Sequence, residues 1–248
     1  MPRRVRWIRD MKARQPGLLL LEAGDFLFAD ERPADEAARR RAEALLDLYA
    51  AAGYRAAAVG ARDLSAGPGF CLDGARRRGL RLLSANLRVK GAAPVPAWTL
   101  LEAGGVRVGV IGVTGTFYGG IRRRGDVEIL DPRQVLAPVV AEVRRKADLV
   151  VLLSNLGDTA DRAIVRAVPG IDLVIGSGAG SPRGGLPAEG RTVLLRTHPR
   201  GKSIGVARVR VQGGSVPPAI QNRLVMLTGN LPEDPEARER VRAALHGR

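Results

Sequence analysis

Short apolar runs alternate with helix-like segments along most of the chain, and this alternation limits the possible folds more than any other feature. A strand that is apolar at consecutive positions has to be buried on both faces, so such runs are typical of sheets covered by helices. The runs expected to form strands are Leu18–Leu21, Ala56–Val59, Arg81–Ser84, Val106–Val113, Leu149–Leu153 and Asp172–Ile175. The sequence therefore predicts an α/β fold.

Segments between these runs have helical periodicity or helix-boundary residues. In one of them Leu45, Leu46 and Tyr49 share a face, and Gly53 follows where a helix would end. The predicted helices are Val5–Gln15, Asp35–Ala52, Gly69–Arg78, Pro132–Lys146 and Thr159–Val168. They are placed to cover the predicted strands.

The pattern changes after Gly176. Val193–Thr197 and Ile204–Val211 lie among Gly- and Pro-rich loops, and the second alternates apolar with basic residues as a half-exposed strand does. We expect a small antiparallel layer there. The polar tail from Pro232 onward has Asp234 and Pro235 as a helix start, so it is predicted to be helical.

Charge is the most unusual property of the composition. The chain has 40 Lys and Arg residues against 25 Asp and Glu, which gives a net charge of +15. A strongly basic chain can bind polyanions through their phosphates. However, the basic residues are almost all Arg, a bias that a GC-rich coding sequence produces by itself, and aromatic residues that could stack on bases make up only 4%. We therefore do not expect nucleic acid as a partner.

Cysteine content and hydropathy exclude further classes. Cys71 is the single cysteine, so the chain has no intrachain disulfide and no cysteine cluster for zinc. The apolar runs are much shorter than the roughly 20 residues that cross a bilayer. No apolar segment with a cleavage site follows the basic N-terminus, so the sequence as written predicts a cytoplasmic protein without a membrane span.

Polar residues and glycines follow several of the predicted strands, where open α/β sheets place their sites. These strand ends are Gly24-Asp25-Phe26, Gly60-Ala61-Arg62-Asp63, Ser154-Asn155-Leu156-Gly157 and Gly176-Ser177-Gly178-Ala179-Gly180. A functional site is therefore expected at the carboxyl edge of the sheet.

The same segments carry a family resemblance. The stretches are LLLLEAGDF, YRAAAVGARDL, LRLLSANL, GGVRVGVIGVTG, ADLVVLLSNLG, VPGIDLVIGSGAG and RGKSIGVARVRV. In order and spacing they resemble the N-terminal domain of 5′-nucleotidases within the calcineurin-like metallophosphoesterases, from about Val5 to Val211. The resemblance implies a four-layer α/β/β/α sandwich over residues 1–211, with the first strand apparently missing. Residues 212–248 would then be a C-terminal extension with a helical tail.

The resemblance also implies a chemistry. Members of the family hold two divalent metals that activate a hydroxide and bind a phosphate ester, using a bridging Asp, an Asn and several His. Asp25 matches the bridging Asp. The family's Gly-Asn-His-Asp is Gly60-Ala61-Arg62-Asp63 here, its Ser-His-Leu-Gly is Ser154-Asn155-Leu156-Gly157, and its Gly-His-x-His coincides with Gly178-Ala179-Gly180. Most metal ligands of the family are therefore missing.

Candidate site residues follow from these matches. Arg62 and Asp63 occupy the positions of the catalytic His-Asp, while Asp25 and Asn155 would be ligands if a metal is bound. Asp25 could instead be a turn-capping carboxylate, or could pair with Arg62 in the vacated metal space. An oxygen-rich Mg²⁺ or Ca²⁺ site that also uses Asp158 is a further possibility. The predicted substrate-binding residues are His198, Arg200 and Lys202.

Three functional hypotheses remain. The first is a degenerate 5′-nucleotidase-like domain with no cofactor and little or no phosphatase activity. The second is an active phosphoesterase with remodelled ligands or a truncated gene model, using Mn, Zn or Mg, which would be exported or periplasmic if the true start lies upstream. The third is an anion- or partner-binding module that uses the basic cleft. A phosphate-containing small molecule is one ligand that these hypotheses allow, and the third also allows a partner protein.

Overall fold

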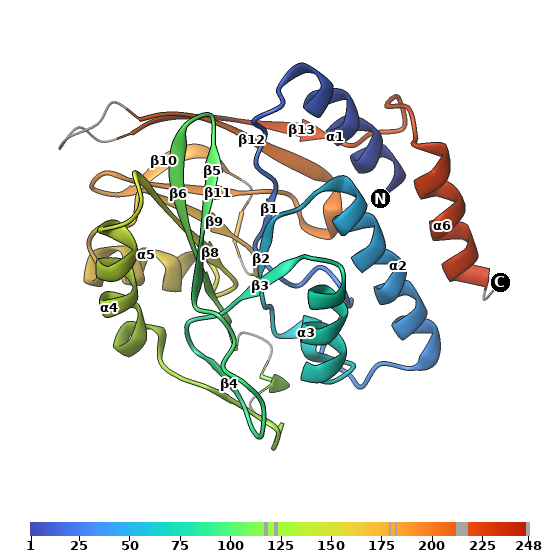
Figure 1. Cartoon of the computed structure of the whole chain (residues 1–248), viewed down its shortest axis with the longest axis horizontal. Helices are drawn as coiled ribbons and strands as arrows, with labels where there is room; N and C mark the ends of the chain where they lie inside the picture. Colours follow the sequence, from blue (N-terminus) through green and yellow to red (C-terminus); the bar gives the residue numbers. More distant parts are fainter. Residues whose placement is uncertain (117–118, 122–123, 179, 182, 212–217, 247–248) are drawn as a thin grey trace.

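Two β-sheets lie face to face in the middle of the molecule, and helices cover their outer faces (Figure 1). The computed structural model describes residues 1–248 except 117–118, 122–123, 179, 182, 212–217 and 247–248. The predicted α/β class is confirmed, with mixed parallel and antiparallel strands.

The smaller sheet has the order β1-β2-β3 and is parallel throughout. Its strands are β1 (Leu21–Glu22), β2 (Ala56–Ala58) and β3 (Arg81–Leu83). The helices that pack beside it are α1 (Pro2–Arg14), α2 (Glu36–Ala52) and α3 (Pro68–Arg77). Asp35 caps α2 by accepting a hydrogen bond from the Ala38 amide at 2.7 Å, and Gly53 ends the helix with a φ of 84°.

The larger sheet has the order β10-β11-β9-β8-β6-β5. Its strands are β5 (Trp98–Ala103), β6 (Val106–Val113), β8 (Leu149–Ser154), β9 (Leu173–Gly176), β10 (Arg183–Glu189) and β11 (Thr192–Arg196). β6, β8, β9 and β11 are parallel, whereas β5 and β10 pair antiparallel at the two edges. The helices packed on this sheet are α4 (Pro132–Arg144) and α5 (Asp158–Ala167).

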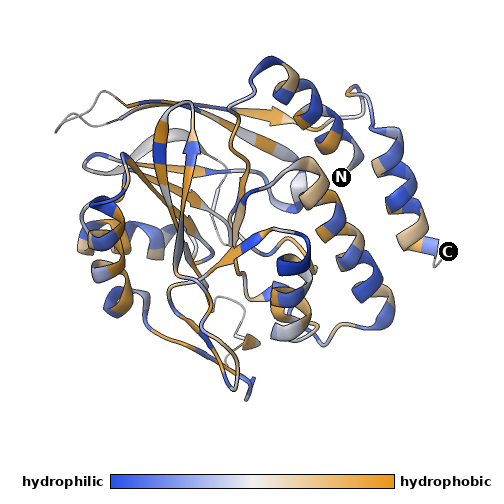
Figure 2. Ribbon diagram, viewed as in Figure 1, coloured by the Kyte–Doolittle hydropathy of each residue, from blue (hydrophilic) through white to orange (hydrophobic). Residues whose placement is uncertain are grey.

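Three apolar clusters show which side chains of each strand face the other sheet and which face the helices. Val151 lies in the cluster between the two sheets, whereas its neighbour Val150 lies in the cluster with α4 and α5. Ala58 likewise faces the larger sheet, and Ala57 belongs to the cluster with α1, α2 and α3. This alternation follows from the period of two in a strand. In Figure 2 the hydrophobic colour follows the strands, while the helices show both colours, as helices with one buried face should.

Short ribbons complete the structure. β4 (Leu87–Val89) pairs antiparallel with β7 (Val127–Ile129), and β12 (Ser203–Arg210) pairs antiparallel with β13 (Ala219–Met226). Helix α6 (Pro235–His246) packs against α1 and α2. Within the residues described, no helix is long and apolar enough to cross a membrane.

The antiparallel layer expected after Gly176 is partly wrong. Val193–Thr197 largely coincides with β11, which is parallel to β9 and extends the larger sheet. Ile204–Val211 largely coincides with β12, whose alternating burial confirms a half-exposed strand, but its partner is the unpredicted β13. The reason is that β11 is shielded on both sides by neighbouring elements, and apolar alternation alone cannot assign a strand to a sheet.

Gly112 of β6 lies against the backbone of β3 in the smaller sheet, and this gives a first testable expectation. A β-carbon at Gly112 would lie 2.2 Å from the carbonyl oxygen of Leu83 in β3, so the backbone itself blocks a side chain. Gly112→Ala should therefore lower the free energy of unfolding by about 3 kcal/mol, measured by urea denaturation. The matched control is Gly125→Ala, because a β-carbon at Gly125 meets no atom within 4 Å. Equal stabilities of the two variants would contradict the close approach.

Candidate functional site

Loops from both sheets meet at the carboxyl ends of β1, β2, β8 and β9. The segment after β1 is hydrogen-bonded to the segment after β2, which is in turn bonded to Asn155 after β8. Asn155 then contacts Ser177 after β9. The structure therefore brings together four of the predicted site residues, namely Asp25, Arg62, Asp63 and Asn155, and we call them the strand-end cluster.

Asp63 is the centre of this cluster. Its side chain is 0% exposed, and its two carboxylate oxygens accept hydrogen bonds from backbone amides alone. Oδ1 accepts from Phe26 and Leu27, each at 2.9 Å. Oδ2 accepts from Asp25 at 2.8 Å and from Gly60 at 2.9 Å. One buried carboxylate thus ties the loop after β1 to the loop after β2.

The electrostatics of Asp63 follow from this position. Burial raises the pKa of the Asp63 carboxyl to about 7, and the nearby charge of Asp25 adds to the rise. The amide donors act in the opposite direction, because they stabilise the charged form. A carboxyl group with a pKa near 7 could exchange a proton, but both oxygens of Asp63 already serve the backbone. Its predicted catalytic role remains a prediction.

Glycines allow the two loops to come so close. A β-carbon at Gly60 would lie 2.2 Å from the Asp25 amide nitrogen and 2.3 Å from Asp25 Oδ1. A β-carbon at Gly24 would lie 2.8 Å from the Gly60 nitrogen, and Gly24 has a φ of 91°. Larger residues at either position would push the loops apart. The glycines noted in the sequence are therefore required by the contact itself.

Asp25 has an uncommon backbone conformation. Its φ is 62°, in the left-handed region that non-glycine residues seldom adopt, although Asp tolerates it better than most. Its Oδ1 accepts the backbone amide of Arg62 at 2.9 Å. This bond matches the turn-capping alternative for Asp25, since the carboxylate closes a loop. The pKa of the nearby Asp30 is lowered mainly by its hydrogen bonds from Arg32, and the charge of Arg62 adds to this effect.

Asn155 is almost fully buried, with both ends of its amide engaged. Oδ1 accepts from the Ala61 amide at 3.2 Å, and Nδ2 donates to Ser177 Oγ at 2.8 Å. Ser177 Oγ donates to the Ala23 carbonyl at 2.6 Å. The oxygen of Asn155 that could bind a cation therefore already accepts a protein hydrogen bond.

A buried ion pair lies beneath the strand-end cluster. Arg196, at the end of β11, is 3% exposed and donates from Nη2 to Asp161 Oδ2 at 2.7 Å. It also donates from Nη1 to the Ser177 carbonyl, and Ser154 Oγ donates to Asp161 Oδ1. Burial raises the pKa of Asp161 to about 6, because desolvation outweighs the bonds from Ser154 and Arg196. This network joins the ends of β8, β9 and β11 to helix α5.

A second buried network joins the two sheets. Thr114 Oγ1 donates to the Val59 carbonyl at 2.7 Å and lies 2.8 Å from Ser84 Oγ. Asn86 accepts the Thr114 amide at 2.8 Å and donates to the carbonyls of Thr114 and Leu130. These side chains are 0% exposed. Short polar side chains thus satisfy backbone groups where strands of both sheets end.

The three predicted substrate-binding residues lie on one turn, η3 (Pro199–Gly201), and its flanks. The His198 amide donates to Ser203 Oγ at 2.9 Å, and His198 Nδ1 lies 3.1 Å from the same oxygen. Arg200 is exposed and has a φ of 59°, and Lys202 is also exposed. This turn lies beside Arg4, which donates to the Ser203 carbonyl at 3.5 Å. Binding of a substrate by these side chains remains a prediction.

A metal cluster is not evident in the part of the chain that the structure describes. No group of three or more His, Cys, Asp or Glu side chains there is arranged to hold an ion. Asp25 and Asp63 are the acidic pair of the strand-end cluster, and three of their four oxygens accept backbone amides. Most carboxylate oxygens of the strand-end cluster are therefore already hydrogen-bonded to the protein backbone.

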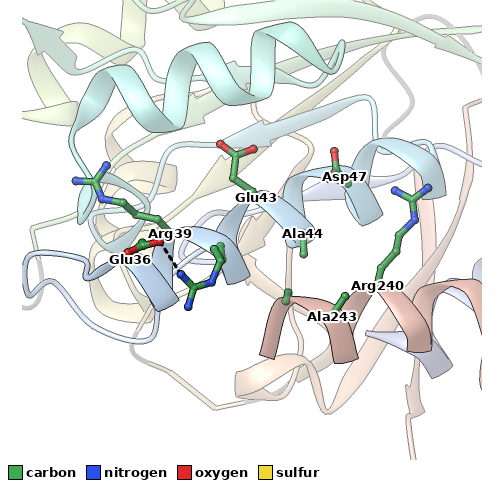
Figure 3. A pocket seen from close by; sticks show the side chains of 9 residues that line it. Glu36, Arg39, Glu43, Ala44, Asp47, Arg240 and Ala243 are labelled. Atoms are coloured by element: carbon green, nitrogen blue, oxygen red, sulfur yellow. Dashed lines mark hydrogen bonds and ion pairs between the residues drawn. The ribbon is translucent and has the colours of Figure 1, made fainter. Parts of the chain in front are cut away.

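An open groove of about 400 Å³ lies elsewhere, between α2 and α6 (Figure 3). Ala44, Ala243 and Ala244 line it together with charged residues such as Glu43 and Arg240. None of its lining residues belongs to the strand-end cluster. It is an open surface between two helices.

Sequence reasoning missed several residues that build the site, namely Ser84, Asn86, Thr114, Asp161 and Arg196, and it placed Ser177 at a strand end without giving it a role. A usable signal existed for two of them, because Ser84 ends a predicted apolar run and Thr114 follows one. No local signal marks Arg196 or Asp161. They are 35 positions apart in the sequence, and only the folded chain makes them partners.

Comparison with known proteins agrees with this architecture. No protein-family model matches the chain. Over 187 residues it is 28% identical to a 5′-nucleotidase of Diplobatis ommata, covering 69% of this chain and 31% of that protein. The structure matches a 5′-nucleotidase precursor from Thermus thermophilus with a TM-score of 0.79 and 23% identity, covering 99% of this chain and 52% of that one.

A third likeness is to a solved chain that this chain covers almost completely. The calcineurin-like phosphoesterase YfkN from Bacillus subtilis matches with a TM-score of 0.76 and 15% identity, covering 100% of this chain and 88% of that one. Both structural likenesses concern the fold. The chain spans about a third of the Diplobatis protein and about half of the Thermus chain.

Proposed function

We propose that this chain, which has the fold of 5′-nucleotidases and calcineurin-like phosphoesterases, has lost the dinuclear metal centre and has little or no metal-dependent phosphatase activity. One observation carries the proposal: four of the five side-chain oxygens of Asp25, Asp63 and Asn155 already accept hydrogen bonds from the protein. They are both carboxylate oxygens of Asp63, Oδ1 of Asp25 and Oδ1 of Asn155.

The neighbouring side chains support the same proposal. Ala61 has no ligand atom, and the guanidinium group of Arg62 is a cation that cannot coordinate a metal. A metal pair would supply the activated water and most of the charge that stabilises a phosphoryl transition state, effects worth several kcal/mol each. Without the pair, the remaining side chains offer no comparable nucleophile. Hydrolysis of phosphate monoesters should therefore be very slow.

The test combines metal analysis with an activity assay. The full chain would be purified, incubated with Mn²⁺, Zn²⁺ or Mg²⁺, and desalted, after which bound metal is counted by mass spectrometry. Turnover of nucleotides and p-nitrophenyl phosphate would be compared with that of Asp25→Asn. Asparagine tolerates the left-handed backbone and keeps the acceptor for Arg62, so this variant should fold. We expect no stoichiometric metal and no difference in turnover.

Other outcomes would favour the alternatives. Two metals per chain, with turnover that Asp25→Asn abolishes, would establish an active metallophosphoesterase and refute the proposal. One metal with metal-dependent turnover would indicate remodelled oxygen ligands. Binding of inorganic phosphate without turnover, weakened by Arg200→Gln with Lys202→Gln, would favour an anion-binding module.

A further inference from the structure

The β12–β13 ribbon carries an unusual set of charges. Its two strands contain three arginines and no acidic residue. Arg208, Arg210 and Arg223 are all exposed. In Figure 1 the ribbon runs along the rim of the molecule, next to α1. Three exposed arginines without an acidic residue on the same ribbon need an explanation apart from the strand-end cluster.

The strand register places the three arginines on one face. Directly opposite residues of an antiparallel pair share a face, as do residues two apart along a strand. Arg208 is opposite Gln221, Arg210 is opposite Ala219, and Arg223 is opposite Val206. We call this side the arginine face. On the reverse side, Val209 and Ile220 pack against the apolar cluster between the two sheets.

Within the part of the chain that the structure describes, these arginines have no partner of opposite charge. Among the residues described, no ion pair or side-chain hydrogen bond involves Arg208, Arg210 or Arg223, whereas Arg78 holds both Glu43 and Asp47. Side chains two residues apart on a strand are about 6.8 Å apart, and diagonal cross-strand neighbours are about 7–8 Å apart. Three like charges at this spacing repel one another, on a chain whose net charge is already +15. A ligand with regularly repeated negative charges would remove the repulsion.

We propose that the arginine face binds the phosphate backbone of duplex nucleic acid, without reading its sequence. A single strand would need aromatic side chains for base stacking, and the face has none. An anionic membrane would need large apolar side chains to insert, but the exposed ones among the described residues are Leu100, Met226 and Leu245, all off this face. The sequence-based expectation against nucleic acid rested partly on stacking, which backbone binding does not use. The proposal is independent of the proposed loss of phosphatase activity.

The test measures how binding depends on salt. Affinity for a fluorescein-labelled DNA duplex would be followed by anisotropy between 50 and 200 mM salt, the range over which phosphate contacts weaken strongly. The variant carries Arg208→Gln, Arg210→Gln and Arg223→Gln. Since each phosphate contact contributes about 0.9 to the slope of log K against log salt, the slope should become shallower by about 2.7.

The matched control removes the same charge elsewhere. It carries Arg40→Gln, Arg76→Gln and Arg240→Gln, three arginines paired on helix surfaces with Glu36, Asp73 and Glu236. It should keep the wild-type slope. If the slope of log K against log salt becomes shallower by the same amount in both variants, or in neither, the arginine face is not the binding surface. Binding to phosphatidylglycerol vesicles without binding to the duplex would also overturn the proposal.

A folding control accompanies these measurements. Removing the mutual repulsion should leave the thermal midpoint of the ribbon variant, at low salt, no lower than that of the wild type. If the triple variant nevertheless unfolds, Arg210→Gln alone gives the same test with a slope change of about 0.9. An unchanged slope in a folded Arg210→Gln would count against the proposal.

Discussion

Asp63→Ala is expected to lower the free energy of unfolding by at least about 4 kcal/mol, because four backbone amides lose the acceptor they share. These amides belong to the loop after β1 and the loop after β2, and this carboxylate holds the two loops together. Each buried donor left unpaired costs about 1–3 kcal/mol. The measurement is urea denaturation followed by circular dichroism. An effect below about 1 kcal/mol would mean that water replaces the carboxylate.

Asp63→Asn keeps the shape of the side chain but removes its charge, so it separates the effect of geometry on stability from that of charge. Its amide oxygen can still serve two donors, but its NH₂ group faces the other two, so we expect a loss of about 3 kcal/mol. Asp30→Asn is the control, since that carboxylate is accessible to solvent and its bonds are to Arg32. It should change stability little.

The pH dependence of stability gives a second measurement on the same residue. The pKa of Asp63 is raised from 3.8 to about 7 in the folded chain. Its contribution is therefore complete below about pH 4 and is lost as the pH rises through about 7. The free energy of unfolding should fall across this range in the wild type and fall less in Asp63→Asn. If the free energy of unfolding changes equally with pH in the wild type and in Asp63→Asn, the pKa of the Asp63 carboxyl is not raised in the folded chain.

Arg196→Met should have the other large effect, a loss of about 3–5 kcal/mol. Removing the guanidinium group leaves Asp161 buried without its cation and removes a donor from the Ser177 carbonyl. Methionine fills a similar volume, so the loss would reflect charge and hydrogen bonding and not a cavity. Differential scanning calorimetry and urea denaturation would both report it.

The double variant Arg196→Met with Asp161→Leu is the decisive control. Replacing both members of a buried ion pair by apolar side chains is often nearly neutral, whereas removing one partner is not. The double variant should therefore be more stable than the sum of the two single changes predicts, by about 2 kcal/mol or more. Strict additivity would mean that the two side chains do not stabilise each other.

The order of strands and helices could be read from local patterns. Leu149–Leu153 is apolar at every position and forms the fully buried core of β8, while Asp35 and Gly53 mark the limits of α2. Some local signals were overlooked. Gly104 and Gly105, with φ values of 59° and 77°, form the two-residue turn of the β5–β6 hairpin. A Gly-Gly pair between two apolar runs is a local pattern that predicts such a turn.

The site could be predicted only in part. Asp25, Asp63 and Asn155 were identified because polar residues follow apolar strands, and the structure brings them together. What each side chain does was not accessible in this way. Asp63 serves as an acceptor for amides 36 to 38 positions away, and that requires the loops to be folded against each other.

The sequence by itself determined the α/β class, the place of the polar residues at strand ends and the shortage of imidazole ligands, since these depend on residue type and neighbouring spacing. Tertiary structure alone decided which polar groups meet: Arg196 with Asp161, Thr114 with the Val59 carbonyl, and three arginines on one face of a ribbon. The physical reason is that burial and hydrogen bonding depend on distances between segments that are far apart in the chain. Only the folded chain, through strand register and the packing of sheets and helices, sets those distances.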